Sequence, residues 1–284
     1  MRGWWREISG LVLPAACEGC GRPRTVLCPA CGAALLGGGA GTGGRTEEVE
    51  EGATAGPRRV RPSPEPPGLP EVHAAAPYAG AVRSLLLAHK ERGALGLAAP
   101  LGTALAAAVE AAAGPLEGAG PAPLLLVPVP SSRRSVRARG HDPTLRIARA
   151  AAARLRRAGR PARVVPVLRQ RRRVADQAGL GARGRRANLS GALEVVPGGG
   201  RLLATGRAVL VDDLMTTGAS LAEAARALGE IHSPFIPYSP EGFPAVSGQG
   251  GIHQRVGAVI ASSPASFDIN RNSAGTWNVA GGER

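Results

Sequence analysis

Aromatic side chains are scarce in this chain of 284 residues, where Phe, Trp and Tyr together make up 3%. A core built from such a sequence must therefore consist mainly of Ala, Val and Leu. Lysine is almost absent as well, since Lys90 is the only one and arginine takes its place throughout. The length allows one large domain or two smaller ones, and it is sufficient to bury a core.

Acidic residues are missing from the middle of the chain. Between Arg133 and Arg186 there are 18 arginines and two acids, Asp142 and Asp176, whereas the formal charge of the whole chain is +14. Codon usage explains arginine in place of lysine, but it does not explain the missing acids. The imbalance indicates an anionic partner, which could be phosphate, pyrophosphate, nucleic acid or a membrane surface.

Long hydrophobic runs and an export signal are also lacking. No stretch approaches the roughly 20 apolar residues that a membrane-spanning helix needs, so we expect no transmembrane segment. Without an export signal we expect the chain to lie in the cytoplasm. Because cytoplasmic thiols are kept reduced, paired cysteines there favour a metal site over disulfides.

All four cysteines fall in a short N-terminal segment as two Cys-x2-Cys pairs. Cys17 and Cys20 form the first pair, Cys28 and Cys31 form the second, and seven residues separate the pairs. Four thiolates at this spacing are typical of a structural Zn²⁺ site with no open coordination position. An iron–sulfur site and two redox-active pairs are the alternatives.

Composition divides the chain into four segments. We expect a small zinc ribbon at 1–36, a flexible linker at 37–70, one larger domain at 71–261 and a disordered tail at 262–284. Residues 231–254 of the larger domain are irregular, either as an insertion or through a reading-frame disturbance.

Strand-like and helix-like stretches alternate along the larger domain. The predicted strands are 72–78, 124–129, 163–168, 192–196, 208–211 and 253–261. The predicted helices are 81–87, 95–113, 143–158 and 220–228. This alternation predicts an α/β domain with a mainly parallel sheet.

The segment 208–220 carries the most informative motif. Four apolar residues form a buried strand, and Asp212 and Asp213 follow at its end, where carboxylates suit ribose hydroxyls or a Mg²⁺ shell. The next loop and helix start can hold a phosphate through backbone N–H and hydroxyl groups, and Gly218 allows close approach. This loop consists of Thr216, Thr217, Gly218, Ala219 and Ser220.

This segment resembles the phosphoribosyl-pyrophosphate signature of type I phosphoribosyltransferases at every position of the motif. The resemblance implies that Asp212 and Asp213 are catalytic residues that hold the two ribose hydroxyls. It also implies that residues 216–220 bind the 5′-phosphate, with Mg²⁺ as the cofactor that accompanies phosphoribosyl pyrophosphate. The alternative is a strand whose acids only cap the following helix.

Further motifs resemble the ComF family, whose members are competence-associated proteins with a phosphoribosyltransferase domain and an N-terminal double Cys-x2-Cys. In chain order these motifs are Tyr78-Ala79-Gly80-Ala81-Val82-Arg83 with Lys90, Val127-Pro128-Val129-Pro130, Arg139-Gly140-His141-Asp142 and Gln177-x2-Leu180-x4-Arg185-x2-Asn188. The resemblance covers roughly residues 17–31 and 72–228. It departs from the family pattern where His141-Asp142-Pro143 replaces Phe-Asn-Gln after Arg-Gly.

A basic loop at 131–140 follows the predicted strand 124–129. In a phosphoribosyltransferase a loop at this place would cover pyrophosphate, whose charge suits guanidinium groups. A solvated basic loop without a ligand is the alternative. The arginines concerned are Arg133, Arg134, Arg137 and Arg139.

Several isolated candidates show no partner pattern. Lys90 could face a ligand, but beside Glu91 and Arg92 it is more typical of a helix end. We expect core or surface roles for the three histidines His73, His89 and His141.

Three functions remain open. The first is an enzyme that transfers a pentosyl group from phosphoribosyl pyrophosphate to an acceptor that the sequence does not identify. The second is a non-catalytic protein of DNA uptake, whose partners would be phosphate, single-stranded DNA or the uptake machinery. The third is a damaged homologue in which residues 231–254 have removed a core strand.

Overall fold

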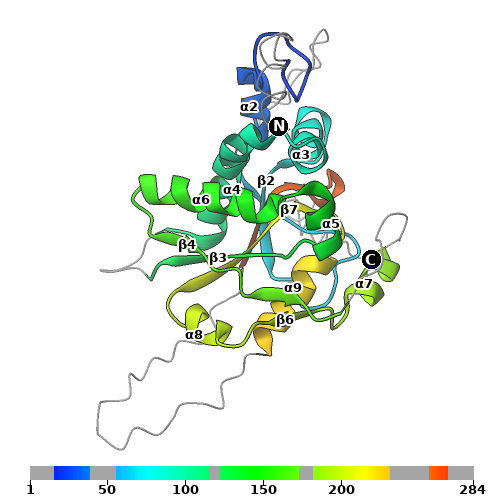
Figure 1. The fold of residues 1–284 in the computed structure, drawn as a ribbon, viewed down its shortest axis with the longest axis vertical. Coiled ribbons are helices and arrows are strands. Elements are labelled where there is room, and N and C mark those ends of the chain that lie inside the picture. The colour runs from blue at the N-terminus through cyan, green and yellow to red at the C-terminus, as the bar shows by residue number, and fades with distance from the viewer. Residues whose placement is uncertain (1–15, 39–55, 116–121, 173–181, 231–255, 268–284) are drawn as a thin grey trace, which may run out of the picture.

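A six-stranded sheet with the order β1-β2-β8-β7-β3-β4 forms the centre of the molecule (Figure 1). The structure is a computed structural model that describes residues 16–38, 56–115, 122–172, 182–230 and 256–267. The strands are β1 (Arg58–Val60), β2 (Glu71–Pro77), β3 (Leu124–Pro128), β4 (Ala162–Val164), β7 (Arg207–Met215) and β8 (Val256–Ser262). Only β1 runs antiparallel to its neighbour, so the predicted α/β fold with a mainly parallel sheet is confirmed.

Helices cover both faces of this sheet, because its inner strands are apolar on both sides. α4 (Ala98–Ala113) and α6 (Pro143–Arg157) pack on each other and on one face, while α9 (Ala219–Gly229) covers the other. Along β3, Leu124 belongs to the core with α4 and α6, and its neighbour Leu125 belongs to the core with α9. Side chains that alternate in this way produce two separate hydrophobic layers.

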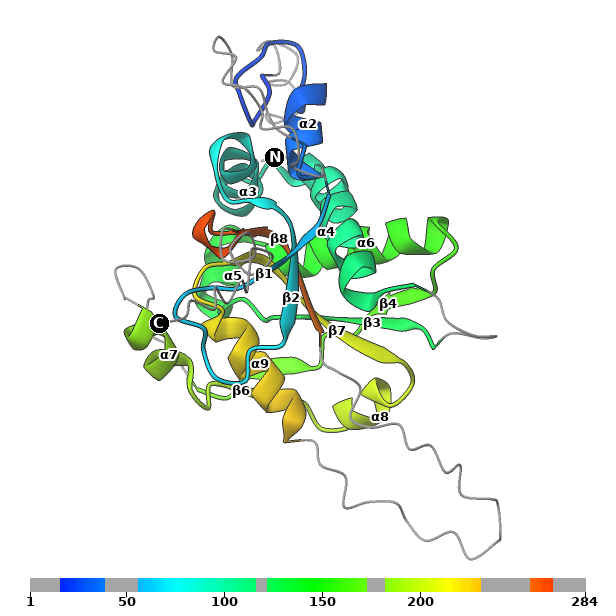
Figure 2. The same cartoon turned by 180° about the vertical axis from the view of Figure 1, so that it is seen from behind.

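Smaller elements flank the side of α9 (Figure 2). A two-stranded antiparallel ribbon pairs β5 (Leu168–Gln170) with β6 (Leu193–Val195), and β6 packs against α9. Two short helices belong to the same region, α7 (Ala182–Leu189) and α8 (Gly199–Leu203).

The chain changes direction across the sheet between β3 and β7. From β3 it passes through α6 to β4 on one side, and from β7 it passes through α9 to β8 on the other side. β3 and β7 are neighbours, so their carboxyl ends form the topological switch point of the sheet. Open α/β sheets bind their ligands at such a point.

The cysteine segment packs on α3 (Gly80–Glu91), as the upper part of Figure 1 shows. Its helix α2 (Pro29–Leu35) contacts both α3 and α4, and Leu35 lies in the same core as Leu85. An ion pair of 3.0 Å between Arg92 Nη2 and Glu18 Oε2 joins the two parts at the end of α3. The N-terminal segment and the sheet domain therefore share one hydrophobic core.

The structure differs from the sequence prediction in the basic region. Residues 133–139 form a helix, α5 (Arg133–Arg139), where a loop was expected, because Ser132 Oγ caps it by accepting from Ser135 N. The single strand expected at 163–168 is divided into β4 and β5, which belong to different sheets. Pro166 lies between them and lacks the N–H that a continuous strand would need.

The expected linker and tail both contain ordered structure. β1 lies within the segment 37–70 and pairs with β2, so this part is not a flexible linker, whereas 39–55 lie outside the described residues. Ser266 and Phe267 follow β8 and pack on the protein, so the ordered part extends beyond residue 262. The irregular segment 231–254 also lies outside the described residues, but the last strand does form, as β8.

One apolar stretch, Leu95–Ala113, is long enough to cross a membrane by length and composition, contrary to the expectation that no stretch comes close. It comprises a 3-10 turn, Leu95–Leu97, followed by α4. Half of this stretch is buried inside the protein, where α4 packs on α6, β2 and β8. Its hydrophobicity is therefore explained by its place in the core.

The close approach of α4 and α6 yields a prediction about stability. A Cβ added at Gly102 would lie 2.5 Å from the Cβ of Ala150. We expect Gly102→Ala to lower the free energy of unfolding by about 1–2 kcal/mol, because overpacking outweighs the gain in helix propensity. Gly96→Ala is the control, since no atom lies within 4 Å of its added Cβ. Urea denaturation checks this, and equal stability of Gly102→Ala and wild type would contradict the packing argument.

Candidate functional site

Two carboxylates extend beyond the end of a neighbouring strand at the switch point. β7 pairs with β3 only as far as Val211, then continues along β8, where Asp212 is paired with Val259. Asp212 and Asp213 therefore lie within the last part of β7, rather than after a strand that ends at residue 211. Because successive side chains of a strand alternate, Asp213 shares the face of Val211, which is the α4 side of the sheet.

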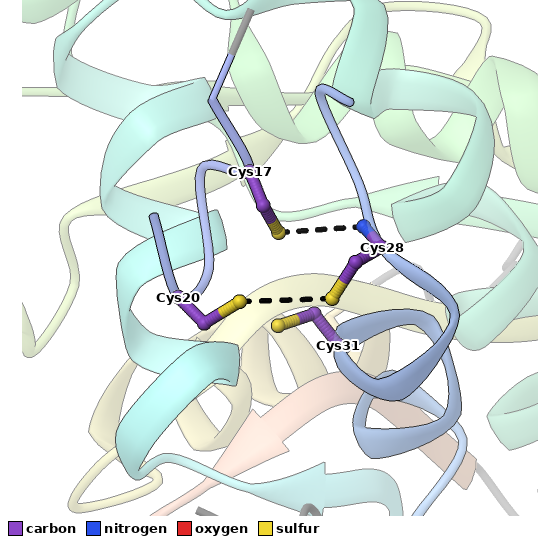
Figure 3. A group of neighbouring side chains, drawn as sticks. All are labelled: Cys17, Cys20, Cys28 and Cys31. Carbon is purple, nitrogen blue, oxygen red and sulfur yellow. Dashed lines mark hydrogen bonds between the residues drawn. The ribbon is translucent and has the colours of Figure 1, made fainter. Parts of the chain in front are cut away.

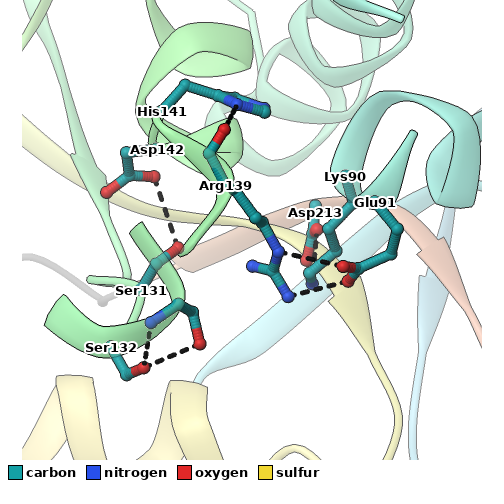
Figure 4. A network of polar contacts seen from close by, with 9 residues as sticks. Lys90, Glu91, Ser131, Ser132, Arg139, His141, Asp142 and Asp213 are labelled. Atoms are coloured by element: carbon teal, nitrogen blue, oxygen red, sulfur yellow. Dashed lines mark hydrogen bonds and ion pairs between the residues drawn. The ribbon is translucent and has the colours of Figure 1, made fainter. Parts of the chain in front are cut away.

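Asp213 is buried and forms an ion pair with Lys90. The distance from Lys90 Nζ to Asp213 Oδ2 is 2.7 Å, and the carboxylate is only 6% exposed (Figure 4). Burial acts to lower the pKa of Lys90, but the charge and the hydrogen bond of Asp213 outweigh it and hold this pKa above its ordinary value. The charged form of Lys90 is thus favoured.

The neighbouring Asp212 has a different environment. Burial and then the charge of Asp213 hold the pKa of Asp212 well above its ordinary range, although Lys90 acts in the opposite direction. Asp212 Oδ1 accepts a hydrogen bond of 2.8 Å from the backbone N–H of Asp213. The protonated form of Asp212 is therefore favoured, and a protonated carboxyl group can donate as well as accept a hydrogen bond.

The loop after β7 leads directly into the start of α9. Gly218 is the N-cap of this helix and has a φ of 72°, in the left-handed region that glycine tolerates best. A side chain there would also meet Leu69, whose Cδ1 would lie 3.0 Å from the added Cβ. Thr216 is exposed, and Thr217 and Ser220 are half-buried, so three hydroxyl-bearing residues lie in or beside the first turn of α9, whose N–H groups have no acceptor within the helix.

The arginine helix α5 stands at the end of β3, beside the same edge of the sheet. It ends at Gly140, which has a φ of 76°. Arg139 donates from Nε and Nη2 to the two carboxylate oxygens of Glu91, at 3.0 and 2.7 Å. Arg134 and Arg137 are exposed, while the side chain of Arg133 lies outside what the structure describes. Of the four predicted arginines, the described contacts bring Arg139 to the carboxylates of β7 through α3.

Two histidines connect the same parts of the chain. The rings of His89 in α3 and His141 after α5 meet edge to face, with centroids 5.8 Å apart. His89 is buried, and this burial lowers its pKa, so the neutral ring is favoured. His141 Nδ1 lies 3.2 Å from the backbone carbonyl of Arg139. The contact packs the end of α5 against α3, which agrees with a core role for His89.

Asp142, one of the two acids between Arg133 and Arg186, has a structural role. Its Oδ1 accepts from Leu145 N at 3.0 Å and from Ser131 Oγ at 3.3 Å. It therefore caps α6 and fixes both ends of the segment that contains α5 (Figure 4).

The four cysteines form a candidate metal centre apart from the switch point. The sulfur atoms of Cys17, Cys20, Cys28 and Cys31 all lie within 4.8 Å of one another (Figure 3). Zn–S bonds of about 2.3 Å in a tetrahedron would separate the sulfurs by about 3.8 Å, and Cys20 and Cys28 are 3.6 Å apart. The cluster could therefore bind a structural zinc ion.

Backbone amides around the cysteines favour a thiolate. Burial acts to raise the pKa of Cys17, but the N–H groups of Cys28, Cys20 and Gly19 outweigh it and lower this pKa to about 6. Burial raises the pKa of Cys31 instead. A bound cation would remove this difference, because metal ligation stabilises every thiolate of the set.

Sequence reasoning missed the contacts of the two charged side chains that α3 contributes to the site, Lys90 as a donor and Glu91 as an acceptor. The prediction that Lys90 lies at a helix end is confirmed, since it belongs to the last turn of α3. The sequence does not show that Lys90 bonds to Asp213 or that Glu91 bonds to Arg139. One signal could have pointed to Lys90: it is the single lysine of a chain that uses arginine everywhere else.

Comparison with models of known protein families finds no match, and a search of curated proteins finds none either.

The cysteine cluster yields a prediction about metal content. We expect the purified protein to hold one zinc ion, and Cys28→Ser to lose it, because three thiolates and a hydroxyl bind zinc far more weakly. Elemental analysis measures the metal, and the Co²⁺-substituted protein should show the absorption of a tetrahedral thiolate site. Thr25→Ala, which lies between the pairs and keeps all four thiols, should retain it. Iron in place of zinc would favour the iron–sulfur alternative.

Proposed function

We propose that this protein binds phosphoribosyl pyrophosphate and is a phosphoribosyltransferase-like protein of the ComF type that transfers a pentosyl group. The observation that carries the proposal is the meeting of three features at one switch point. The carboxylates of β7, the Gly218 loop before α9 and the arginine helix α5 all lie at the carboxyl ends of β3 and β7. A ligand with a ribose and two kinds of phosphate needs such a combination.

Each part of the ligand has a partner in this arrangement. Asp212 and Asp213 would hold the ribose hydroxyls through hydrogen bonds with their carboxyl groups. The N–H groups and hydroxyls of residues 216–220 would bind the 5′-phosphate at the start of α9. Arginines of α5 would bind the pyrophosphate, which leaves when an acceptor attacks the anomeric carbon.

A magnesium ion would accompany this ligand. Oxygen donors suit it, and the carboxylates at the end of β7 provide them beside the proposed pyrophosphate position. When bound, Mg²⁺ would neutralise charge on the pyrophosphate as it leaves. The cysteine cluster would hold a structural zinc, and its packing on α3 supports a stabilising role for this ribbon.

Calorimetric titration of phosphoribosyl pyrophosphate with Mg²⁺ tests the proposal. We expect wild type to bind with micromolar affinity. In Asp212→Asn/Asp213→Asn we expect the affinity to fall by about 30-fold or more, because the sugar hydroxyls lose their carboxylate acceptors. The control Glu71→Gln/Glu110→Gln removes the same charge at the opposite, amino edge of the sheet and should bind normally.

No binding by folded, zinc-loaded wild type would overturn the proposal. If the double variant still binds the ligand, the two carboxylates are not part of the binding site, and the ligand binds elsewhere on the protein. Only binding that depends on them would justify a screen of acceptors for turnover.

A non-catalytic nucleic-acid protein is the second candidate, and the outer surface of α6 favours it. Its exposed arginines form no ion pair with an acid among the described residues. They are Arg146, Arg149, Arg154, Arg156 and Arg157. Arg156 is occupied in part, since Nη1 donates to the Ala162 carbonyl at 2.8 Å. Such a surface suits the backbone of single-stranded DNA.

Salt-dependent binding of an oligothymidylate tests this second function. If the α6 surface binds DNA, Arg149→Gln/Arg154→Gln/Arg157→Gln should weaken binding and reduce the slope of log K against log salt by about 2, at about 0.7 for each phosphate contact. The matched control replaces three arginines that already pair with acids: Arg59, Arg61 and Arg92. Equal slopes in both variants would exclude α6 as the DNA surface.

A further inference from the structure

The last turn of α3 contributes two adjacent charges to the switch point. Lys90 bonds to Asp213 of β7, and Glu91 bonds to Arg139 of α5 (Figure 4). α3 thus bridges β7 itself and α5, the helix that follows β3, although it is next to neither in the sequence. Neither bond is needed to close the helix itself, because α3 is completed by the N–H of Arg92, which donates to the Ala88 carbonyl.

The described contacts join five ionisable groups into one charge cluster. Lys90 and Arg139 are its cations, and Asp212, Asp213 and Glu91 are its acids. Arg139 also lies near enough to Lys90 for its charge to act against the protonation of that lysine. Each of the two cations already has an acid as its partner. A phosphate that binds to Lys90 or Arg139 would therefore have to displace a carboxylate from that cation.

Glu91 occupies the guanidinium N–H groups of Arg139 that a phosphate would also use. The guanidinium donates from Nε and Nη2 to both carboxylate oxygens, which is the same forked geometry that a phosphate would use. Arg139 is 21% exposed and Glu91 47% exposed, so the acid can swing into solvent more easily than the arginine can. Arg139 precedes Gly140, whose left-handed conformation ends α5 and leaves the guanidinium beside α3.

We propose that Glu91 is an affinity-determining residue, which holds Arg139 in the absence of ligand and competes with the ligand's pyrophosphate for its guanidinium. Binding is then an exchange of partners, in which Arg139 passes from the Glu91 carboxylate to a phosphate. Glu91 remains on the solvent side and contributes no contact to the ligand. The inference rests on the proposed function, since it concerns the affinity of the same site.

The exchange predicts a gain of affinity when Glu91 loses its charge. Exposed ion pairs are worth about 0.2–1 kcal/mol, so removal of this competitor should tighten binding by about 1.4- to fivefold. Partial unfolding of the variant would weaken binding, so it cannot produce a gain in affinity. The gain should also vanish when Arg139 is absent, because Glu91 acts only through that side chain.

Calorimetric titrations with phosphoribosyl pyrophosphate and with inorganic pyrophosphate, each with Mg²⁺, test the inference. The proteins are wild type, Glu91→Gln, Arg139→Gln and the double variant, all checked for zinc content and circular dichroism. Glu71→Gln is the matched control, because it removes an acid paired with Arg59 at the far edge of the sheet and should leave affinity unchanged. We expect tighter binding in Glu91→Gln alone and no effect of that substitution in the Arg139→Gln background.

The outcomes separate the inference from the function on which it rests. If wild type binds and Glu91→Gln binds equally or more weakly, the exchange is wrong while the proposed function stands. Tightening that persists without Arg139 would also overturn it, as a general charge effect would then suffice. If neither wild type nor Glu91→Gln binds either probe, both proposals fall. Binding by Glu91→Gln with none by wild type would support the exchange in a stronger form.

Discussion

A buried carboxylate at the end of a central strand requires a cation, and Lys90 provides it for Asp213. The cost of removing an unpaired carboxylate from water amounts to several kcal/mol, so β7 could not end in this way without a partner. The partner comes from α3, which is separated from β7 in the sequence by the four strands β3, β4, β5 and β6. The position of α3 is in turn fixed by packing against the 3-10 turn Leu95–Leu97 and against the helix of the cysteine segment, α2. One ion pair thus ties the N-terminal part of the chain to the candidate site.

The same helix makes the site a meeting of three separate stretches. Three residues of α3 make these connections. Glu91 contacts Arg139 of α5, and Lys90 contacts Asp213 of β7. His89 packs against His141, which follows α5. A change at the end of α3 therefore alters the carboxylates and the arginine helix together. This arrangement gives the candidate site a shared support that neither β3 nor β7 supplies alone.

Much of the fold could be predicted because its signals are local. The apolar runs of β3 and β7, the paired cysteines, and the carboxylates followed by Gly218 are each contained in a few residues. The partners of these groups could not be predicted, since Lys90 and Asp213 are 123 residues apart and no local pattern links them. The sequence does not predict α5, although Ser132 and Gly140 mark its two ends, because a run of arginines is also typical of a solvated loop. β1 was missed because a three-residue edge strand has almost no pattern of its own.

The separation between Lys90 and Asp213 has a consequence for synthesis of the protein. All four cysteines are available once residue 31 has left the ribosome, so this part could bind a metal ion early. α3 can then dock on it, but the ammonium of Lys90 must stay hydrated until β7 has been translated, and β8 closes the sheet later still. Contacts of such long range form slowly, since the intervening chain must be ordered first. The nascent chain would thus contain all four cysteines well before its candidate site exists. Chaperones would bind the incomplete sheet, in which the apolar faces of α4 and β3 are still exposed.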